Sequence, residues 1–320
     1  MESEIFVSLA DALRRPLPSD DLPRPKKGIP SGIETFDHCL GGLRAGDLVV
    51  IAGGREAGKT ALALTLAYNI ASRDFCGLLP PDTPGESVVF FSLGLPVRQL
   101  AMRVLAIQTS IPVRNIELGT FTADQVSRVR AAAAEMGRIS LLFNAAIHSA
   151  LPLLKQAARE LHSRSPLRCL LVDDFHLVGD EYGSNTDHYS SHFCGLKSLA
   201  LELRIPIVVV ADLPDWAPSR PDDTPDLSDL MGMKGLHHAD IAMTVASFER
   251  QFHHFHPEPF PGSRKWLKWR KTARHFEGSA LVQVYAGGAS RASMFLRHDP
   301  DTLRFLDLIP RCEGVDAPAP

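Results

Sequence analysis

The chain has little that suggests secretion, membrane insertion or a metal site built from cysteines. Its five cysteines are odd in number and widely spaced, and no two have metal-ligand spacing, which is typical of reduced thiols. No apolar run approaches the length of a membrane-spanning helix, and the acidic start over 1–4 is unlike the basic start of a secretory signal. The sequence therefore predicts a cytoplasmic protein with no membrane segment.

The chain also lacks a strong charge of either sign and any internal repeat. Its formal net charge of −3 over 320 residues neither indicates nor excludes nucleic acid, because a narrow basic channel can exist on a nearly neutral protein. Apolar residues make up 45% of the sequence, which is enough for a sizeable core in one large domain or two small ones.

One glycine-rich stretch, residues 53–60, fits the phosphate-binding loop pattern of Gly, four residues and Gly-Lys-Thr. An apolar, β-branched run precedes it and good helix formers follow it, and this context disfavours a chance loop in front of a core helix. Lys59 is expected to reach the β- and γ-phosphates, and Thr60 to supply a hydroxyl to Mg²⁺. The predicted nucleotide-binding residues are Gly53, Gly54, Arg55, Glu56, Ala57, Gly58, Lys59, Thr60 and Ala61.

Helices and buried strands are predicted to alternate beyond this loop. Strands are expected over 87–93, 140–143, 168–174 and 206–211, and helices over 96–109, 122–137, 149–163 and 187–203. The alternation predicts an α/β fold with a mostly parallel sheet covered on both faces. Later strands, which are expected to extend the sheet with antiparallel pairs, are predicted over 240–246, 265–273 and 279–285.

Both ends of the chain are predicted to lie outside this domain, which spans 28–310. An amphipathic helix over 3–15 and a proline-rich tether make up 1–27. Because an isolated helix of this length is marginal in water, it is expected to pack on its own domain or on a neighbouring subunit. The Pro/Ala-rich residues 311–320 are expected to be disordered.

A carboxylate at the end of a buried strand supplies a second nucleotide-binding element. Asp173 ends the strand over 168–174, and a carboxylate at the carboxyl end of a parallel strand can hold the water shell of Mg²⁺. The alternative is a carboxylate that only caps the next turn. The phosphate loop upstream favours the first interpretation, which makes Thr60 and Asp173 the predicted Mg²⁺ residues.

Several short motifs then occur in a fixed order between residues 28 and 285. They are Gly28–Gly32, Gly41–Leu43, Gly46–Leu48, Gly58–Leu64, Val89–Leu93, Val172–Asp173 with Leu177, Ile205–Val209, Leu227–Leu230 and Ala239–Asp240. Together they resemble the motor domain of DnaB-type replicative DNA helicases. The RecA-like circadian-clock and recombination ATPases share the first half of the set, but not Phe-Phe-Ser-Leu or Leu-Ser-Asp-Leu.

The resemblance implies a RecA-like P-loop ATPase that uses ATP and Mg²⁺ to unwind DNA in the 5′ to 3′ direction during replication. It also implies a homo-hexamer, or a mixed ring with another helicase, with single-stranded DNA in a central channel and nucleotide between subunits. Residues 3–15 take the place of the family's linker helix, which docks on the neighbouring subunit. Since no long segment precedes Ser3, a stand-alone motor without the family's primase-interacting domain is expected.

Three features depart from the family's pattern. Gly94 stands where the family has the glutamate that activates the attacking water, and loss of a general base typically lowers a rate by about 10²–10⁴-fold. His176 and Asp212 stand where the family has glutamines that sense the γ-phosphate. A carboxylate at Asp212 is expected to face the nucleotide's charge unfavourably unless it binds the metal or turns away. The stretch between Leu230 and Ala239 is shorter by one residue and lacks the family's acidic residues.

Asp174 is a candidate substitute for the missing glutamate. In some other phosphate-loop ATPases the catalytic glutamate follows the metal-binding aspartate directly, as Asp174 follows Asp173 here. Its side chain is one methylene shorter, however, and strand alternation is expected to point it to the opposite face. A plain turn or a supporting role is the favoured alternative.

Residues 264–274 carry six cations together with Trp266 and Trp269. They read as a solvated edge strand blunted by lysines or as a stacking platform for bases, although the two tryptophans face opposite ways in a strand. In the family that the chain resembles, a Lys-x-Arg pair on this strand reaches the γ-phosphate of a neighbour's nucleotide as an arginine finger. The resemblance makes Arg274 the candidate finger by position, with Arg270 as the alternative by spacing.

A histidine-rich segment is the remaining candidate metal site. His253, His254 and His256 with Glu258 are metal-ligand residue types, but their phenylalanine and proline neighbours favour a surface loop.

The sequence leaves three functional hypotheses open. The first is a working or weakened DnaB-like helicase motor, and the second is a non-hydrolysing nucleotide-binding paralogue that assembles with or regulates another helicase. Gly94 favours the second, while the intact phosphate loop favours nucleotide binding in both. The third, a RecA-like recombination or clock-type ATPase, would need a different second half of the chain.

Overall fold

The computed structural model describes residues 28–72, 86–144, 150–178, 188–213, 225, 229–230, 233–247, 258–286 and 289–307. The predicted linker helix over 3–15, its tether and the predicted tail over 311–320 lie outside these ranges.

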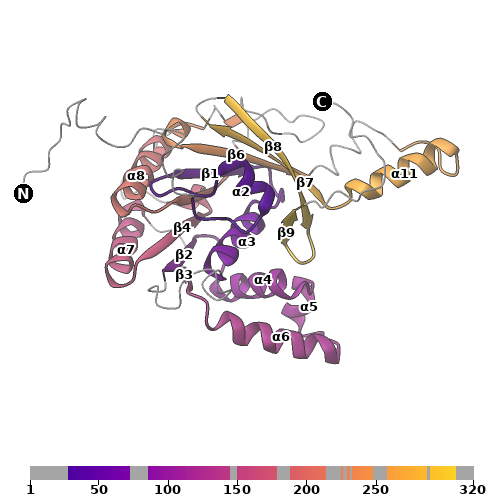
Figure 1. Ribbon diagram of the computed structural model, residues 1–320, viewed down its shortest axis with the longest axis horizontal. Helices are drawn as coiled ribbons and strands as arrows, with labels where there is room; N and C mark the ends of the chain where they lie inside the picture. The colour runs from indigo at the N-terminus through magenta and orange to yellow at the C-terminus, as the bar shows by residue number, and fades with distance from the viewer. Residues whose placement is uncertain are drawn as a thin grey trace, which may run out of the picture.

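A single nine-stranded sheet runs through the described part of the chain, in the order β3-β2-β4-β5-β1-β6-β7-β8-β9 (Figure 1). The strands are β1 (Leu48–Gly53), β2 (Ser87–Ser92), β3 (Leu141–Asn144), β4 (Leu167–Asp173), β5 (Ile207–Asp212), β6 (Ile241–Ser247), β7 (Ser279–Ala286), β8 (Ala289–Asp299) and β9 (Arg304–Asp307). Pairs from β3 to β6 in this order are parallel, and those from β6 to β9 are antiparallel. The predicted α/β fold, with antiparallel strands near the C-terminus, is confirmed.

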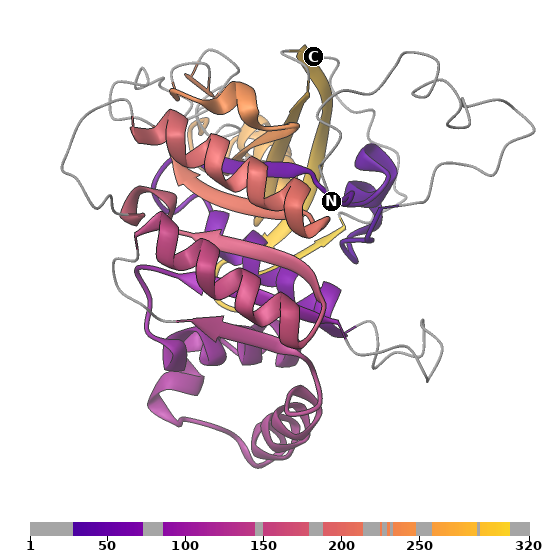
Figure 2. The ribbon, with the colours of Figure 1, turned by 90° about the vertical axis from the view of Figure 1, so that its left-hand side faces the viewer.

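Helices cover both faces of the parallel strands, and Figure 2 shows α7 and α8 side by side in front of the sheet. The helices are α2 (Glu34–Leu40), α3 (Lys59–Ser72), α4 (Val97–Thr109), α5 (Val113–Leu118), α6 (Ala123–Met136), α7 (Leu151–Arg164), α8 (His188–Leu203) and α11 (Arg264–Phe276), with short 3₁₀ turns η1 (Phe175–Leu177) and η2 (Leu236–His238). Within the described ranges, no helix combines the length and the apolar character needed to cross a membrane.

The core has two halves because successive side chains of a strand point to opposite faces of the sheet. On β1, Val49 and Ile51 belong to the cluster that includes α3 and α4. The alternate residues Leu48 and Val50 belong to the cluster that includes α7 and α8. Every β1 residue is therefore buried, which explains why the strand is a continuous apolar run and not an alternating one.

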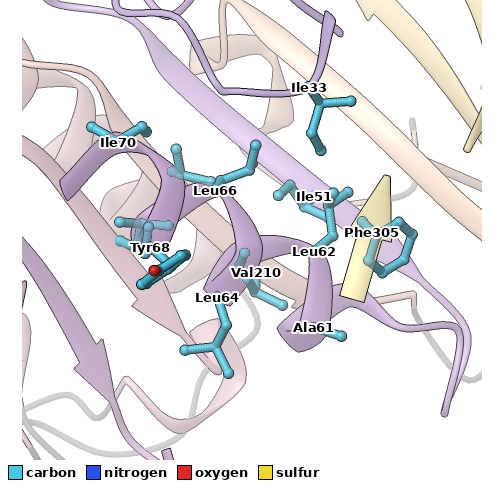
Figure 3. Close-up of a cluster of buried hydrophobic side chains, with 14 of the residues drawn as sticks. Ile33, Ile51, Ala61, Leu62, Leu64, Leu66, Tyr68, Ile70, Val210 and Phe305 are labelled. Carbon is cyan, nitrogen blue, oxygen red and sulfur yellow. The ribbon is translucent and has the colours of Figure 1, made fainter. Parts of the chain in front are cut away.

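Helix α3 is the most deeply buried helix that touches the phosphate loop. Figure 3 shows its side chains, among them Leu62, lying with Ile51 of β1, Val210 of β5 and Phe305 of β9. Segments that are far apart in the sequence therefore fix the helix that begins at Lys59.

The strand predicted over 265–273 is wrong, because this segment forms helix α11. Ser263 caps the helix by accepting a hydrogen bond from the Trp266 backbone N–H at 3.0 Å. Trp266, Trp269 and Ala273 recur at spacings of three and four and are its less exposed side chains. The two tryptophans therefore share a face, and the argument that they point opposite ways falls with the strand.

The last two strands, which the sequence did not predict, close the sheet against helix α2. No side chain caps α2 from Ile33, its N-cap residue, but Asp307 at the end of β9 accepts hydrogen bonds from the backbone N–H groups of Glu34 and Thr35, both at 2.8 Å. Partial burial alone would raise the pKa of Asp307, but these hydrogen bonds outweigh it and lower the pKa. A residue 273 positions away thus supplies the cap that the local sequence lacks.

We predict that Asp307→Ala lowers the free energy of unfolding by about 1 kcal/mol, the usual effect of losing a helix N-cap. Because the folded pKa is depressed, this contribution is present above the unfolded pKa of about 3.9 and is lost as the pH falls through the folded pKa. Urea unfolding at pH 7 and near pH 3.5 measures it. Asp301→Ala, in the exposed turn of the same hairpin, is the control, and equal losses in both variants would contradict the capping role.

Candidate functional site

The phosphate loop lies at one edge of the sheet, between the end of β1 and the start of α3. In register, Gly53 of β1 pairs with Asp212 of β5, and Ser92 of β2 pairs with Asp173 of β4. These four strands are parallel, so their carboxyl ends and the residues that follow meet at this edge. Ligands of open α/β sheets bind at such an edge.

Two glycines of the loop occupy positions that a larger residue would not fit. A Cβ on Gly53 would lie 2.6 Å from the carbonyl oxygen of Val245 on β6. Gly58 has φ +92°, and a Cβ there would lie 3.1 Å from atoms of both His298 and Phe305. The loop is therefore packed between β6 and the β8–β9 hairpin.

Lys59 is buried, and its ammonium has two partners. Nζ donates to the carbonyl oxygen of Gly54 at 2.7 Å and forms an ion pair with Oδ1 of Asp212, also at 2.7 Å. The expectation that Asp212 must bind a metal or turn away is wrong, because its carboxylate pairs with the lysine of the loop. The signal was available in the sequence, since Asp212 ends the strand beside β1.

Thr60 and Asp173, the two predicted Mg²⁺ residues, are in contact. The hydroxyl of Thr60 donates to Oδ1 of Asp173 at 3.2 Å, across 113 positions of sequence. Burial raises the pKa of Asp173 to about 6; the hydrogen bond from Thr60 opposes this rise and the charge of Asp174 adds to it. A hydroxyl and a buried carboxylate are hard oxygen donors, so this pair fits Mg²⁺.

Asp174 does not continue the strand, because β4 ends at Asp173. Its carboxylate accepts a hydrogen bond from the backbone N–H of His176 at 3.2 Å and caps η1, so strand alternation does not set its direction. Burial raises the pKa of Asp174, the bond from His176 lowers it, and the charge of Asp212 raises it further. This electrostatic coupling brings Asp174 to the same edge as the phosphate loop.

Two further residues at this edge were missed by sequence reasoning. The ring Nε2 of His176 donates to the backbone carbonyl oxygen of Asp212 at 2.9 Å and so ties the turn after β4 to the end of β5. Arg103 of α4 lies close enough to lower the pKa of Asp173, against the larger effect of burial. No local pattern marks Arg103, because only the packing of α4 brings it there.

Gly94 follows β2 in a tight turn at this edge and is exposed. The hydroxyl of Ser92 accepts from the backbone N–H of Leu95 at 3.1 Å and donates to its carbonyl oxygen at 3.0 Å, which holds the turn. The position therefore offers no side chain toward the nucleotide edge.

A family model described as the DnaB-like helicase C-terminal domain matches residues 28–253. The chain belongs to this family. The replicative DNA helicase DnaB of Rickettsia prowazekii is 28% identical over 245 residues, which are 76% of this chain and 50% of that protein. The replicative DNA helicase DnaC of Bacillus subtilis is 27% identical over 206 residues, 63% of this chain and 43% of that protein. The chain spans about half the length of the curated relatives it matches.

Solved structures share the fold. A DnaB-like replicative helicase, described with its interactions with primase, has a TM-score of 0.71 at 20% identity and covers 88% of this chain and 62% of its own. A solved ATPase domain also has a TM-score of 0.71, at 19% identity over 88% of this chain and 91% of its own. The RecA-like architecture of the DnaB family is thus shown for this chain.

The candidate DnaB-type arginine fingers lie on α11, which projects from the end of the sheet, away from α3 (Figure 1). The guanidinium of Arg270 lies over the ring of Trp266, 4.9 Å from its centroid, so its own helix engages it. Arg274 is on the same helix, and its side chain is outside the described part.

The histidine-rich segment is only partly described. His253, His254 and His256 lie outside the described ranges, whereas Glu258 accepts a hydrogen bond from Nε1 of Trp266 at 2.8 Å. Over the described residues, no group of three or more His, Cys, Asp or Glu side chains is arranged to hold a metal ion.

We predict that Gly58→Ala lowers the free energy of unfolding by about 1–3 kcal/mol, because it adds left-handed strain and crowds His298 and Phe305. Two controls separate these causes. Gly119→Ala adds strain at φ +67° in open space, and Gly54→Ala adds a methyl group with nothing within 4 Å. Chemical unfolding should rank the losses as Gly58 above Gly119 above Gly54. A Gly58→Ala protein as stable as the Gly54→Ala protein would contradict the packing of the loop.

Proposed function

We propose that this chain is the nucleotide-binding motor of a DnaB-like replicative helicase that uses ATP with Mg²⁺. The observation that carries the proposal is the contact between Thr60 of the phosphate loop and Asp173 of β4, beside the buried ammonium of Lys59. This set of a hydroxyl, a carboxylate and a lysine is what a phosphate-loop ATPase requires. The family membership and the fold support the same conclusion.

Each residue of the site has a defined task in this proposal. The backbone amides of residues 54–60 and the N-terminus of α3 bind phosphate oxygens, and Lys59 places its charge on the β- and γ-phosphates. Thr60 and Asp173 would hold Mg²⁺, Thr60 directly and Asp173 through its water shell, and the bound ion supplies charge neutralisation to the phosphates.

Hydrolysis is expected to be slow because the chain lacks a glutamate at Gly94. When water attacks the γ-phosphorus and the bond to the β–γ bridging oxygen breaks, a base must accept a proton from that water. Asp174 is the candidate base, since its carboxylate is coupled electrostatically to Asp212 and Lys59 at the same edge. Its bond to His176 fits a capping role equally well.

Assembly into a ring would complete the site. We place nucleotide between subunits of a homo-hexamer or of a mixed ring with another helicase, and single-stranded DNA in the central channel, in the cytoplasm. The position of α11, apart from the rest of its own chain, supports a finger that acts on a neighbour, with Arg274 as the candidate. Residues 3–15 would dock on the adjacent subunit.

A non-hydrolysing partner of another helicase is the second candidate function. Gly94 is the observation that favours it, because nucleotide binding needs only the phosphate loop, Thr60 and Asp173. The recombination or clock-type alternative has no support from the family membership.

We predict that the protein binds Mg·ATP with micromolar affinity, about −8 kcal/mol, and that Lys59→Ala weakens binding at least about 100-fold. The variant removes the charge that Lys59 contributes to the phosphate loop. Isothermal titration calorimetry measures both affinities, with Lys155→Ala on α7 as the control for loss of a lysine elsewhere. Absence of heat and of thermal stabilisation with any nucleotide would refute the proposed function.

We predict steady-state ATP turnover at least about 100-fold below that of a motor with a general base, with and without single-stranded DNA. Gly94→Glu should raise it, provided that the ring is assembled. Asp174→Asn should lower turnover only if Asp174 is the base, whereas Asp301→Asn is a neutral control. Turnover of order 10 per second that is insensitive to Asp174→Asn would show that another group activates the water.

A further inference from the structure

We propose that Asp212 is an internal competitor for nucleotide phosphate, which weakens binding of ADP and ATP at the phosphate loop and makes the site selective for conditions of high nucleotide. This inference rests on the proposed function, since it concerns the ligand of the same loop. It assigns a role in tuning affinity to a carboxylate that takes no part in holding Mg²⁺ in that proposal.

The competing contact is the ion pair between Nζ of Lys59 and Oδ1 of Asp212, 2.7 Å long. The side chain of Lys59 is 9% exposed, so its ammonium has little access to water and depends on protein oxygens. Gly54 supplies one such oxygen and Asp212 supplies the only charged one that contacts Nζ in the described part of the chain. A phosphate group that binds Lys59 must take the place of this carboxylate.

The carboxylate is held at the loop by its backbone on two sides. Gly53 lies beside Asp212 in the β1–β5 register, and its carbonyl oxygen accepts from the backbone N–H of Leu213 at 3.2 Å. On the other side, His176 donates from its ring to the carbonyl oxygen of Asp212 at 2.9 Å. Because the backbone is fixed, the carboxylate stays next to the loop even when it releases Lys59.

The side chain of Asp212 nevertheless has room to move. It is 40% exposed, so its carboxylate can turn toward solvent without disturbing the buried end of β5. Phosphate binding would then exchange one anionic partner of Lys59 for another while the displaced carboxylate remains nearby. The resulting loss of affinity combines the broken ion pair with repulsion between Asp212 and the phosphates.

The exchange affects only ligands that reach Lys59. Lysines of phosphate loops contact the β- and γ-phosphates, so ADP and ATP meet the competition from Asp212. AMP carries neither phosphate and should be indifferent to it. The comparison of AMP with ADP and ATP therefore separates competition at Lys59 from a general change in the site.

Calorimetric titration of the full chain with Mg·ATP, Mg·ADP and AMP tests the proposal. Asp212→Asn keeps the shape of the side chain but removes its charge, so it should bind Mg·ATP and Mg·ADP about tenfold more tightly than the natural protein. Asp212→Ser is a second variant in case Asn perturbs folding. Asp174→Asn is the matched control, since it removes a neighbouring negative charge without a contact to Lys59, and should change affinity less than about threefold.

The outcomes separate this inference from the proposed function. Tighter ADP and ATP binding by both Asp212 variants, with AMP unchanged, supports the competition, as does ATP binding that appears only when Asp212 is replaced. If the natural protein binds ATP through Lys59 but the Asp212 variants bind it equally or more weakly, the inference is wrong and the proposed function stands. If neither form binds any nucleotide, both fall.

Discussion

A buried lysine must keep its charge neutralised, and this requirement shapes the candidate site. Lys59 begins α3 inside the core, so oxygens must come to its ammonium from the surrounding loops. Gly54 and Asp212 supply them in this structure, and phosphate oxygens would supply them in a nucleotide complex. The order of strands makes this possible, because β5 lies directly beside β1 and brings Asp212 to the loop.

The C-terminal strands serve the same edge from the other side. Phe305 stacks on His298, with ring centroids 4.4 Å apart, and both lie against Gly58. Asp307 at the end of the same hairpin caps α2. The geometry of the phosphate loop therefore depends on residues more than 200 positions later in the chain, and not only on its own glycines.

The sequence predicted the parallel half of the fold well, because its strands are continuous apolar runs and its loop motif is local. It also predicted the Thr60–Asp173 pair, since both residues follow from strand ends and motif spacing. The strand over 265–273 was wrong because the resemblance suggested a strand, whereas the Ser263 cap and the spacing of Trp266 and Trp269 favour a helix. The Lys59–Asp212 pair and the approach of Arg103 depend on strand order and helix packing, which no local pattern encodes.

The most direct test of the account is the distance from Nζ of Lys59 to Oδ1 of Asp212 in a crystal structure with Mg²⁺ and a non-hydrolysable ATP analogue. The account predicts that the 2.7 Å ion pair is broken, that Lys59 contacts phosphate oxygens, and that Thr60 and Asp173 lie at the metal. A nucleotide bound elsewhere, or one bound at the loop with the ion pair intact, would contradict it.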